Sequence, residues 1–285
     1  MANPVGPSPA LRFNEVMAEN AGAVTNGGTL PDWVELYNPG TNAVFLANWS
    51  LSNSGNPRKY VFPSGTTIAG QSYLVVWCDS QTGAPGLHSG FNLGRKGESL
   101  FLYDAATNRV DAFTFGVQLA NYTVGRVGPA ATWQLCLPTP GSNNLAAAVG
   151  GATNLVINEW LANPAAGGSD WLELYNLSPN QPVALAGLYL ATGNDLFQMR
   201  SVSFLGPRSF VQLFADKNPG PDHLDFKLSA SGDQLALSDA LGQPLDQVTF
   251  GPQLEGVSQG RWPNGSSTII SFAGTASPGA SNYVI

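Results

Sequence analysis

Charged side chains are scarce in this chain of 285 residues. They make up 11% of the sequence, well below the roughly 25% of an ordinary soluble domain. Hydrophobic residues still account for 43%, so the composition is that of a folded chain and not of a disordered one. Polarity comes mainly from Asn, Ser, Thr, Gln and Gly, which is typical of β-rich proteins found outside the cell.

Positive charge is the scarcest kind. The chain has 12 Lys and Arg against 19 Asp and Glu, a net charge of −7, and the basic residues form no run. Nucleic-acid affinity comes largely from neutralising phosphates, and attraction to anionic lipid also needs basic clusters. No apolar stretch approaches the roughly 18 residues that span a bilayer. We therefore expect no nucleic-acid partner and no membrane insertion.

The first seven residues, Met-Ala-Asn-Pro-Val-Gly-Pro, lack the basic and apolar regions of a secretory leader. Two interpretations remain open. Either the chain is cytosolic, or a leader has been removed from a secreted or cell-surface protein. The neutral polar composition favours the second, so we expect a secreted or cell-surface location.

What the chain does contain is an internal repeat of domain length. Asp-Trp-Val-Glu-Leu-Tyr-Asn at 32–38 returns as Asp-Trp-Leu-Glu-Leu-Tyr-Asn at 170–176, a period of 138 residues (170 − 32). Further motifs recur in the same order: Asn-Glu at 14–15 and 158–159, Asp-x-x-Thr-Phe-Gly at 111–116 and 246–251, Gly-Arg at 125–126 and 260–261, and Pro-Gly at 140–141 and 278–279. Such a period is too long for a solenoid and fits a whole domain. The sequence predicts one copy at 9–144, a linker at 145–153 and a second copy at 154–285.

Short β-branched and aromatic runs, separated by Gly, Pro, Asn and Ser, predict strands almost throughout. In the first copy such runs lie at 33–37, 73–77, 100–103 and 112–115. No stretch holds a helical period, although one helical turn is possible in the linker. About seven to nine short strands per copy predict an all-β chain of two tandem antiparallel β-sandwiches.

In this order, the motifs resemble the bacterial lamin tail domain family. The resemblance rests on the Asn-Glu opening, the Asp-Trp-x-Glu-Leu-Tyr-Asn strand, Leu-His-Ser-Gly-Phe-Asn-Leu at 87–93, the Thr-Phe-Gly strand and the closing Pro-Gly-Ser-Asn. It covers nearly the whole chain as two copies. It implies an immunoglobulin-like sandwich and a non-catalytic module without a cofactor, of a kind that in bacteria typically accompanies secreted or surface-attached hydrolases and nucleases. The second copy departs at Phe214, which replaces Trp77, a change compatible with a core position.

The two cysteines, Cys78 and Cys136, both lie in the first copy, and the second copy has Ala215 and about Gly274 in their places. Joint presence and joint absence are expected of a bonded pair. A bridge would stabilise the fold by roughly 4 kcal/mol on the loop-entropy model and would indicate an oxidising compartment. The alternative is two independent buried thiols. We favour the disulfide.

The repeated signature strand has two chemically different faces. Because side chains alternate along a strand, Trp33, Glu35 and Tyr37 lie opposite Val34 and Leu36. The corresponding row of the second copy is Trp171, Glu173 and Tyr175. If the aliphatic residues line the core, this row faces outward and is a candidate sugar-binding platform. Alternatively, a loop or strand covers the row and makes it a second small core, which is the arrangement we favour.

An acidic set is also repeated, as Glu15, Asp32 and Glu35, then Glu159, Asp170 and Glu173. One interpretation is calcium binding, with Glu15 and Asp32, or Glu159 and Asp170, as candidate ligands. A second is general acid–base catalysis, which is disfavoured because residues along one strand with Trp33 between them do not face one another. We favour the third, bracing of the fold, with a carboxylate accepting from Arg126 or Arg261.

The only histidines, His88 and His223, occupy equivalent positions. Structural zinc needs three or four ligands, and the second copy has no cysteine or further histidine to supply them. No Gly-x-Ser-x-Gly motif supports a Ser-His-Asp triad. We expect each histidine to pack, or to make a loop hydrogen bond, before the strand at 91 or 226.

These observations predict a non-catalytic binding or tethering module whose partner is a protein or a polysaccharide at the cell surface. Protein interaction predicts an exposed apolar patch or an exposed edge strand. Carbohydrate binding predicts exposed Trp33 and Trp171. A hydrolase, the least expected class, predicts acidic residues that converge in a cleft with strongly perturbed pKa values.

Overall fold

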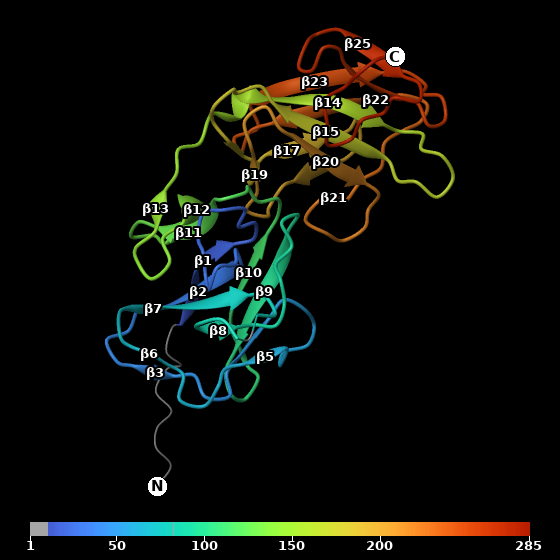
Figure 1. The fold of residues 1–285 in the computed structure, drawn as a ribbon. Helices are drawn as coiled ribbons and strands as arrows, with labels where there is room; N and C mark the ends of the chain where they lie inside the picture. Colours follow the sequence, from blue (N-terminus) through green and yellow to red (C-terminus); the bar gives the residue numbers. More distant parts are fainter. Residues whose placement is uncertain (1–10, 82) are drawn as a thin grey trace. The chain divides into compact units, whose positions relative to one another are not determined.

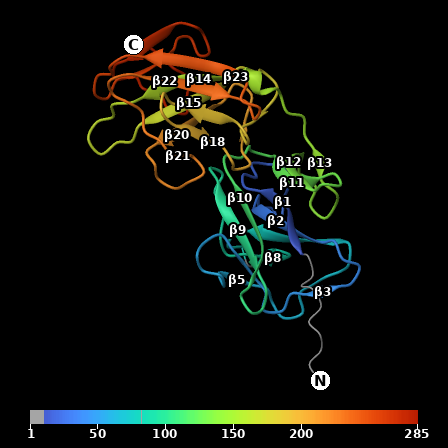
Figure 2. The same ribbon diagram turned by 180° about the vertical axis from the view of Figure 1, so that it is seen from behind.

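The computed structural model describes residues 11–81 and 83–285. The seven residues behind the expectation about a leader lie outside this part. The chain divides into two compact units between Ala147 and Ala148, here called domain 1 and domain 2. Across the described residues the regular elements are strands, apart from one 3-10 turn at Ala152–Asn154. The predicted all-β fold is therefore confirmed, and it can be followed from two sides in Figure 1 and Figure 2.

Domain 1 is built on a large sheet of order β13-β12-β11-β1-β2-β7-β8. Its strands are β1 (Arg12–Met17), β2 (Asp32–Asn38), β7 (Ser72–Cys78), β8 (Leu87–His88), β11 (Thr123–Val127), β12 (Thr132–Leu137) and β13 (Leu145–Ala146). The second sheet has the order β10-β9-β4-β5, with β10 (Arg109–Phe115), β9 (Glu98–Tyr103), β4 (Ser50–Ser52) and β5 (Tyr60–Val61). A separate pair joins β3 (Val44–Phe45) to β6 (Thr67–Ile68).

Domain 2 repeats this plan without a counterpart of β13. Its large sheet has the order β21-β20-β15-β14-β24-β25, with β14 (Leu155–Leu161), β15 (Trp171–Asn176), β20 (Phe210–Ala215), β21 (His223–Leu224), β24 (Ser258–Arg261) and β25 (Ile269–Phe272). The second sheet has the order β18-β17-β22-β23, with β17 (Tyr189–Ala191), β18 (Leu196–Gln198), β22 (Asp233–Ser238) and β23 (Pro244–Phe250). A further pair joins β16 (Val183–Ala184) to β19 (Phe204–Leu205).

The period-two pattern places the core as expected. Val34 and Leu36 of β2 are fully buried, as are Leu100 and Leu102 of β9 in the second sheet. The four strands predicted in the first copy correspond to β2, β7, β9 and β10, each extending one or more residues further than the apolar run. Aliphatic residues on alternate positions thus build the layer between the sheets.

Residues at both ends of the predicted linker, 145–153, are hydrogen-bonded to the neighbouring domain. Leu145 and Ala146 pair with β12, and Ala147 donates its N–H to Leu135 O. On the other side Gly150 donates to Pro182 O at 2.7 Å and forms a bridge with Val183. Most of 145–153 therefore belongs to one domain or the other, because these backbone groups find hydrogen-bond partners in the adjacent sheets.

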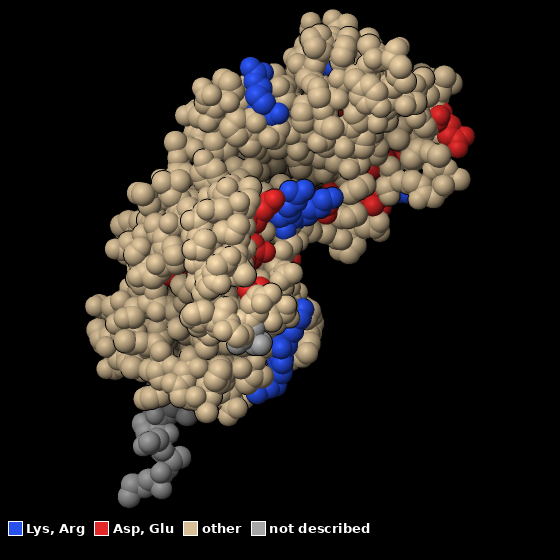
Figure 3. All heavy atoms as spheres, viewed as in Figure 1, with Lys and Arg blue, Asp and Glu red and all other residues tan. Residues whose placement is uncertain are grey.

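No helix in the described part of the chain is long and apolar enough to cross a membrane. Figure 3 shows charged side chains only as scattered groups on a surface formed mostly by other residues.

Candidate functional site

The aromatic and acidic row of the signature strand is buried in both domains. Trp33 and Glu35 are 0% exposed and Tyr37 is half-buried, while Trp171, Glu173 and Tyr175 are 5%, 0% and 6% exposed. The exposure required of a sugar platform is therefore absent at both tryptophans. The covered arrangement is observed instead: the closing Pro-Gly segment lies over the row, and the N–H groups of Gly141 and Gly279 donate to Glu35 and Glu173.

A pair of carboxyl groups lies at the centre of each buried row. Glu15 of β1 is the cross-strand partner of Glu35 of β2, and Glu159 of β14 is the partner of Glu173 of β15. Directly opposed residues project from the same face of a sheet, and all four side chains are fully buried. Each domain thus has two glutamates facing one another away from water.

A β-bulge explains how the Asn-Glu motif reaches this pair. The register between the first two strands shifts between Phe13 and Glu15, and again between Ile157 and Glu159. A bulge inserts a residue and re-aims the neighbouring side chains. The asparagine inside it donates to the facing glutamate, from Asn14 Nδ2 to Glu35 Oε1 at 2.8 Å. In domain 2 the equivalent bond is 3.0 Å long.

The first glutamate of each pair is satisfied by hydroxyl and backbone donors. Glu15 accepts from Thr123 Oγ1 at 2.5 Å and from both the N–H and the hydroxyl of Thr139 at 3.1 Å. Glu159 accepts from Ser258 Oγ at 2.6 Å and from Ser277 Oγ at 3.2 Å. Buried carboxylates need such donors to offset their lost hydration. The acids therefore tie the closing segment to the sheet.

Burial also changes the protonation of these groups. Desolvation raises the pKa of Glu35 to about 7, partly offset by bonds from Gly141 and Asn14 and reinforced by the charge of Glu15. In domain 2 it raises the pKa of Glu173 to about 8, with Glu159 adding to the shift. Burial raises the pKa of Glu15 and of Glu159 as well. Each pair therefore holds a proton to higher pH than an exposed glutamate does.

The repeated arginines brace the bulge, but through a different acid than expected. Arg261 Nε donates to Ile157 O at 2.8 Å, and its Nη2 contacts both oxygens of Asp246 at 2.8 and 3.0 Å. Asp246 in turn accepts from the Ile157 N–H at 2.7 Å. None of the six predicted acids is a partner of either arginine in these bonds. The sequence does contain a signal for the aspartate partner, because Asp111 and Asp246 open the repeated Asp-x-x-Thr-Phe-Gly motif.

The domain 1 version of this brace is looser. Arg126 Nε donates to Phe13 O at 2.8 Å, and Asp111 Oδ2 accepts from the Phe13 N–H at 2.8 Å. The two charged groups approach only to 3.9 Å. Arg126 instead lies over the ring of Trp133, 4.5 Å from its centroid, a favourable cation–π position.

Asp32 and Asp170 lie on the other face of the signature strand from Glu35 and Glu173, because they are three residues away. Asp32 accepts from the Asn20 N–H at 3.1 Å, and Asp170 accepts from the Leu228 N–H at 3.0 Å. The proposed calcium pairs are therefore wrong, since Glu15 and Asp32, like Glu159 and Asp170, project from opposite faces. Within the described residues no group of three potential metal-ligating side chains is found.

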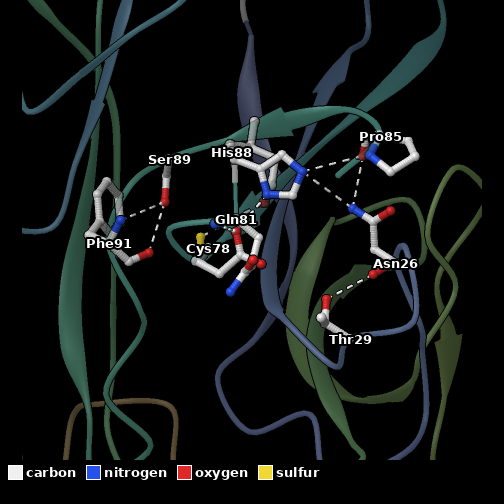
Figure 4. Close-up of polar contacts among 10 residues, drawn as sticks. Asn26, Thr29, Cys78, Gln81, Pro85, His88, Ser89 and Phe91 are labelled. Atoms are coloured by element: carbon white, nitrogen blue, oxygen red, sulfur yellow. Dashed lines mark hydrogen bonds and ion pairs between the residues drawn. The ribbon is translucent and has the colours of Figure 1, made fainter. Parts of the chain in front are cut away.

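Each histidine is paired with an aspartate at the end of the preceding strand. His88 Nδ1 lies 2.5 Å from Asp79 Oδ1, and His223 Nδ1 lies 2.8 Å from Asp216 Oδ1. Figure 4 shows the His88 ring also in contact with Pro85 and Asn26. The pKa of Asp216 is lowered to about 2. Burial would raise this pKa, but the hydrogen bonds from His223 and Asn218 outweigh burial. Sequence reasoning anticipated a loop hydrogen bond but not its acceptor.

The predicted disulfide is wrong. Cys78 and Cys136 are both buried free thiols. Cys78 ends β7 and Cys136 lies in β12, with β11, β1 and β2 between them in the sheet. Four strand spacings amount to about 19 Å, far beyond the roughly 7 Å that a disulfide can bridge between Cα atoms. The cysteines therefore give no information about the redox compartment.

Comparison with known families agrees with the fold and the repeat. A family model described as Lamin Tail Domain matches residues 4–116 and 149–252, which is more than half of the chain. No curated protein matches the chain. The matched segments contain the bulge, the signature strand and the Thr-Phe-Gly strand of both copies. The chain therefore belongs to the lamin tail domain family, as two tandem immunoglobulin-like copies.

Proposed function

We propose that the chain is a non-catalytic module, secreted or held at a cell surface, that binds or tethers a partner protein. Family membership supports the non-catalytic part, because lamin tail domains are immunoglobulin-like modules. The buried acids support it further. They converge and have raised pKa values, as a hydrolase would require, but they are fully buried and their donors belong to the fold.

The observation that carries the interaction role is an open hollow in domain 2 with two exposed leucines in its lining. It has a volume of about 470 Å³ and is lined in part by Tyr189, Leu196, Ala240 and Leu241. Leu196 and Leu241 are 65% and 85% exposed. Leu241 lies in the turn between β22 and β23, and Leu196 begins the edge strand β18. Covering large exposed apolar side chains with a partner removes them from water and lowers the free energy.

Domain 1 lacks these two leucines at the equivalent places. The turn at Asp104 and the turn at Asp239 have the same hydrogen bonds, which aligns Ala106 with Leu241. The strand registers align Lys59 with Leu196. The two leucines are thus features of one copy and are not needed for the shared fold.

A protein suits this surface better than a polysaccharide does. Leucine side chains offer no hydrogen bonds to sugar hydroxyl groups. Apolar residues of a partner protein, by contrast, can pack against the leucines and leave water. Of the aromatic residues predicted to form a sugar platform, Trp33, Trp171 and Tyr175 are buried and Tyr37 is half-buried.

The test uses the residues of domain 1 as substitutions. The full chain is immobilised, exposed to secreted and cell-surface proteins, and the captured protein is purified and titrated by calorimetry. We expect Leu196→Lys/Leu241→Ala to weaken its binding by roughly tenfold or more, as the loss of two buried leucine contacts implies. Phe45→Ala, which removes an exposed aromatic residue of domain 1, is the control and should bind like the wild type. Equal binding by the double variant would contradict the proposal, as would binding only to an oligosaccharide panel.

A further inference from the structure

Domain 1 contains a second hollow, of about 360 Å³, on the Asp32 face of its large sheet. It is formed by the segment before β2, the end of β7 and the segment that carries Asn92 and Leu93. Leu30 in the lining is 44% exposed, and Pro31 next to it is buried. Asp32 and Asp79 are acidic residues of the lining. The hollow thus combines a mainly polar lining that contains two acidic side chains with an exposed leucine.

The acidic groups of this hollow are incompletely satisfied. Asp79 Oδ2 is a buried atom that accepts no hydrogen bond among the described residues. Asp32 receives backbone bonds from Asn20 and Leu93, but desolvation prevails and raises its pKa to about 6, and the charges of Glu19 and Glu98 add to the shift. The charges of these two glutamates thus disfavour ionisation of Asp32. A cation placed beside it would relieve that cost.

Domain 2 satisfies the equivalent groups from within. Asp216 Oδ2 accepts from Asn218 Nδ2 at 2.9 Å and from Ser169 Oγ at 3.3 Å. Lys227 lies close enough to Asp170 for its charge to lower the pKa that burial raises. Domain 1 has Pro31, Gln81 and Asn92 at the places of Ser169, Asn218 and Lys227. Domain 2 therefore carries its own lysine beside the acid that domain 1 leaves without one.

We propose that the hollow lined by Asp32, Asp79 and Asn92 binds a lysine or arginine side chain of the partner protein. This inference rests on the proposed interaction role and names the chemistry that domain 1 recognises. The aliphatic stem lies against Leu30, and the cationic head lies near Asp32. A long basic side chain covers apolar surface in this way while its charge stays near an acceptor.

The experiment is an NMR titration of the ¹⁵N-labelled full chain with the tripeptide Ac-Gly-Lys-Gly-NH₂. We expect concentration-dependent shifts of the amides of Leu30, Gln81 and Leu93, and no shift at Leu228. The matched peptide Ac-Gly-Nle-Gly-NH₂, in which norleucine replaces lysine, has the stem without the charge and should bind roughly tenfold more weakly. Equal shifts with both peptides, or shifts that avoid these amides, would overturn the proposal.

Two variants sharpen the result. Asn92→Lys supplies domain 1 with the residue of domain 2 and should abolish the peptide-induced shifts, while Ala106→Lys adds the same charge in an exposed turn and should leave them intact. Asp32→Asn should also abolish them, while the amide resonances of the rest of domain 1 stay in place and show that the fold persists. Unchanged shifts in Asn92→Lys would rule out this hollow. If the partner protein still loses affinity in Leu196→Lys/Leu241→Ala, the interaction role stands even when the peptide does not bind.

Discussion

The two domains are alike where they are buried and different where they meet solvent. Each has an Asn-Glu bulge, a facing glutamate pair and a glycine N–H that donates to the second glutamate. At the surface, domain 1 has an open acidic hollow and domain 2 has exposed leucines. The shared motif therefore serves the fold, and the residues in which the copies differ are the ones available for recognition.

The largest effect is expected from removing a buried glutamate. Glu173→Ala leaves Asn158 Nδ2 and the Gly279 N–H without their acceptor, and each buried unpaired donor costs about 1 to 3 kcal/mol. We expect domain 2 to lose roughly 2 to 6 kcal/mol of unfolding free energy, measured by denaturant titration with tryptophan fluorescence. Glu35→Ala should have the same effect on domain 1. A loss in only one domain would break the equivalence of the two pairs.

The pH dependence of stability should separate the domains. The folded pKa of Glu173 is about 8 and that of Glu35 about 7, both above the ordinary 4.5. The native state then holds the proton where the unfolded state has lost it, so the stabilisation is complete below pH 4.5 and is lost as pH rises through the folded pKa. Asp32, raised to about 6, acts in the same direction in domain 1.

We therefore expect the melting temperature to fall between pH 5 and 8, with the decline of domain 2 extending about one pH unit further. Glu173→Gln, which cannot titrate, should make the decline of domain 2 shallower and leave that of domain 1 unchanged. Calorimetric scans across pH 5 to 9 provide the measurement. Stability that rises over this window would contradict the assigned direction of both shifts.

The arginine brace should contribute more in domain 2. Asp246 accepts two short bonds from Arg261, whereas Asp111 lies 3.9 Å from Arg126. Because charge-assisted hydrogen bonds at this length are stronger than an ion contact of 3.9 Å, Asp246→Asn should cost about 1 kcal/mol more than Asp111→Asn. Paired denaturant titrations measure this difference. Equal costs would show that the cation–π contact of Arg126 compensates fully.

The smallest effect is expected from reduction. Because Cys78 and Cys136 are free, a reductant should leave the melting temperature of domain 1 unchanged. Burial raises the pKa of Cys136 to about 12 and raises that of Cys78 as well, so neither thiol should react with a thiol reagent until the chain unfolds. If fewer than two thiols react in denaturant without reductant, the cysteines are bonded and the assignment of free thiols is wrong.

Much of the fold was predictable because repetition and period-two alternation are visible in the sequence. The sequence marked Glu35 and Glu173 as repeated, and alternation placed them on the side opposite Val34. It did not reveal that the closing Pro-Gly segment folds back over that side, because this contact joins residues 106 apart. The cysteines were mispaired for a related reason. Strand order in the sheet determines their separation, and local patterns do not encode that order.

The most direct test of the account is one titration of the partner protein with a chain carrying Asn92→Lys, Leu196→Lys and Leu241→Ala, beside a denaturant titration of the same variant. The account predicts that affinity falls by roughly tenfold or more while the free energy of unfolding changes by less than about 0.5 kcal/mol. Unchanged affinity would contradict the claim that exposed residues that differ between the two domains bind the partner protein.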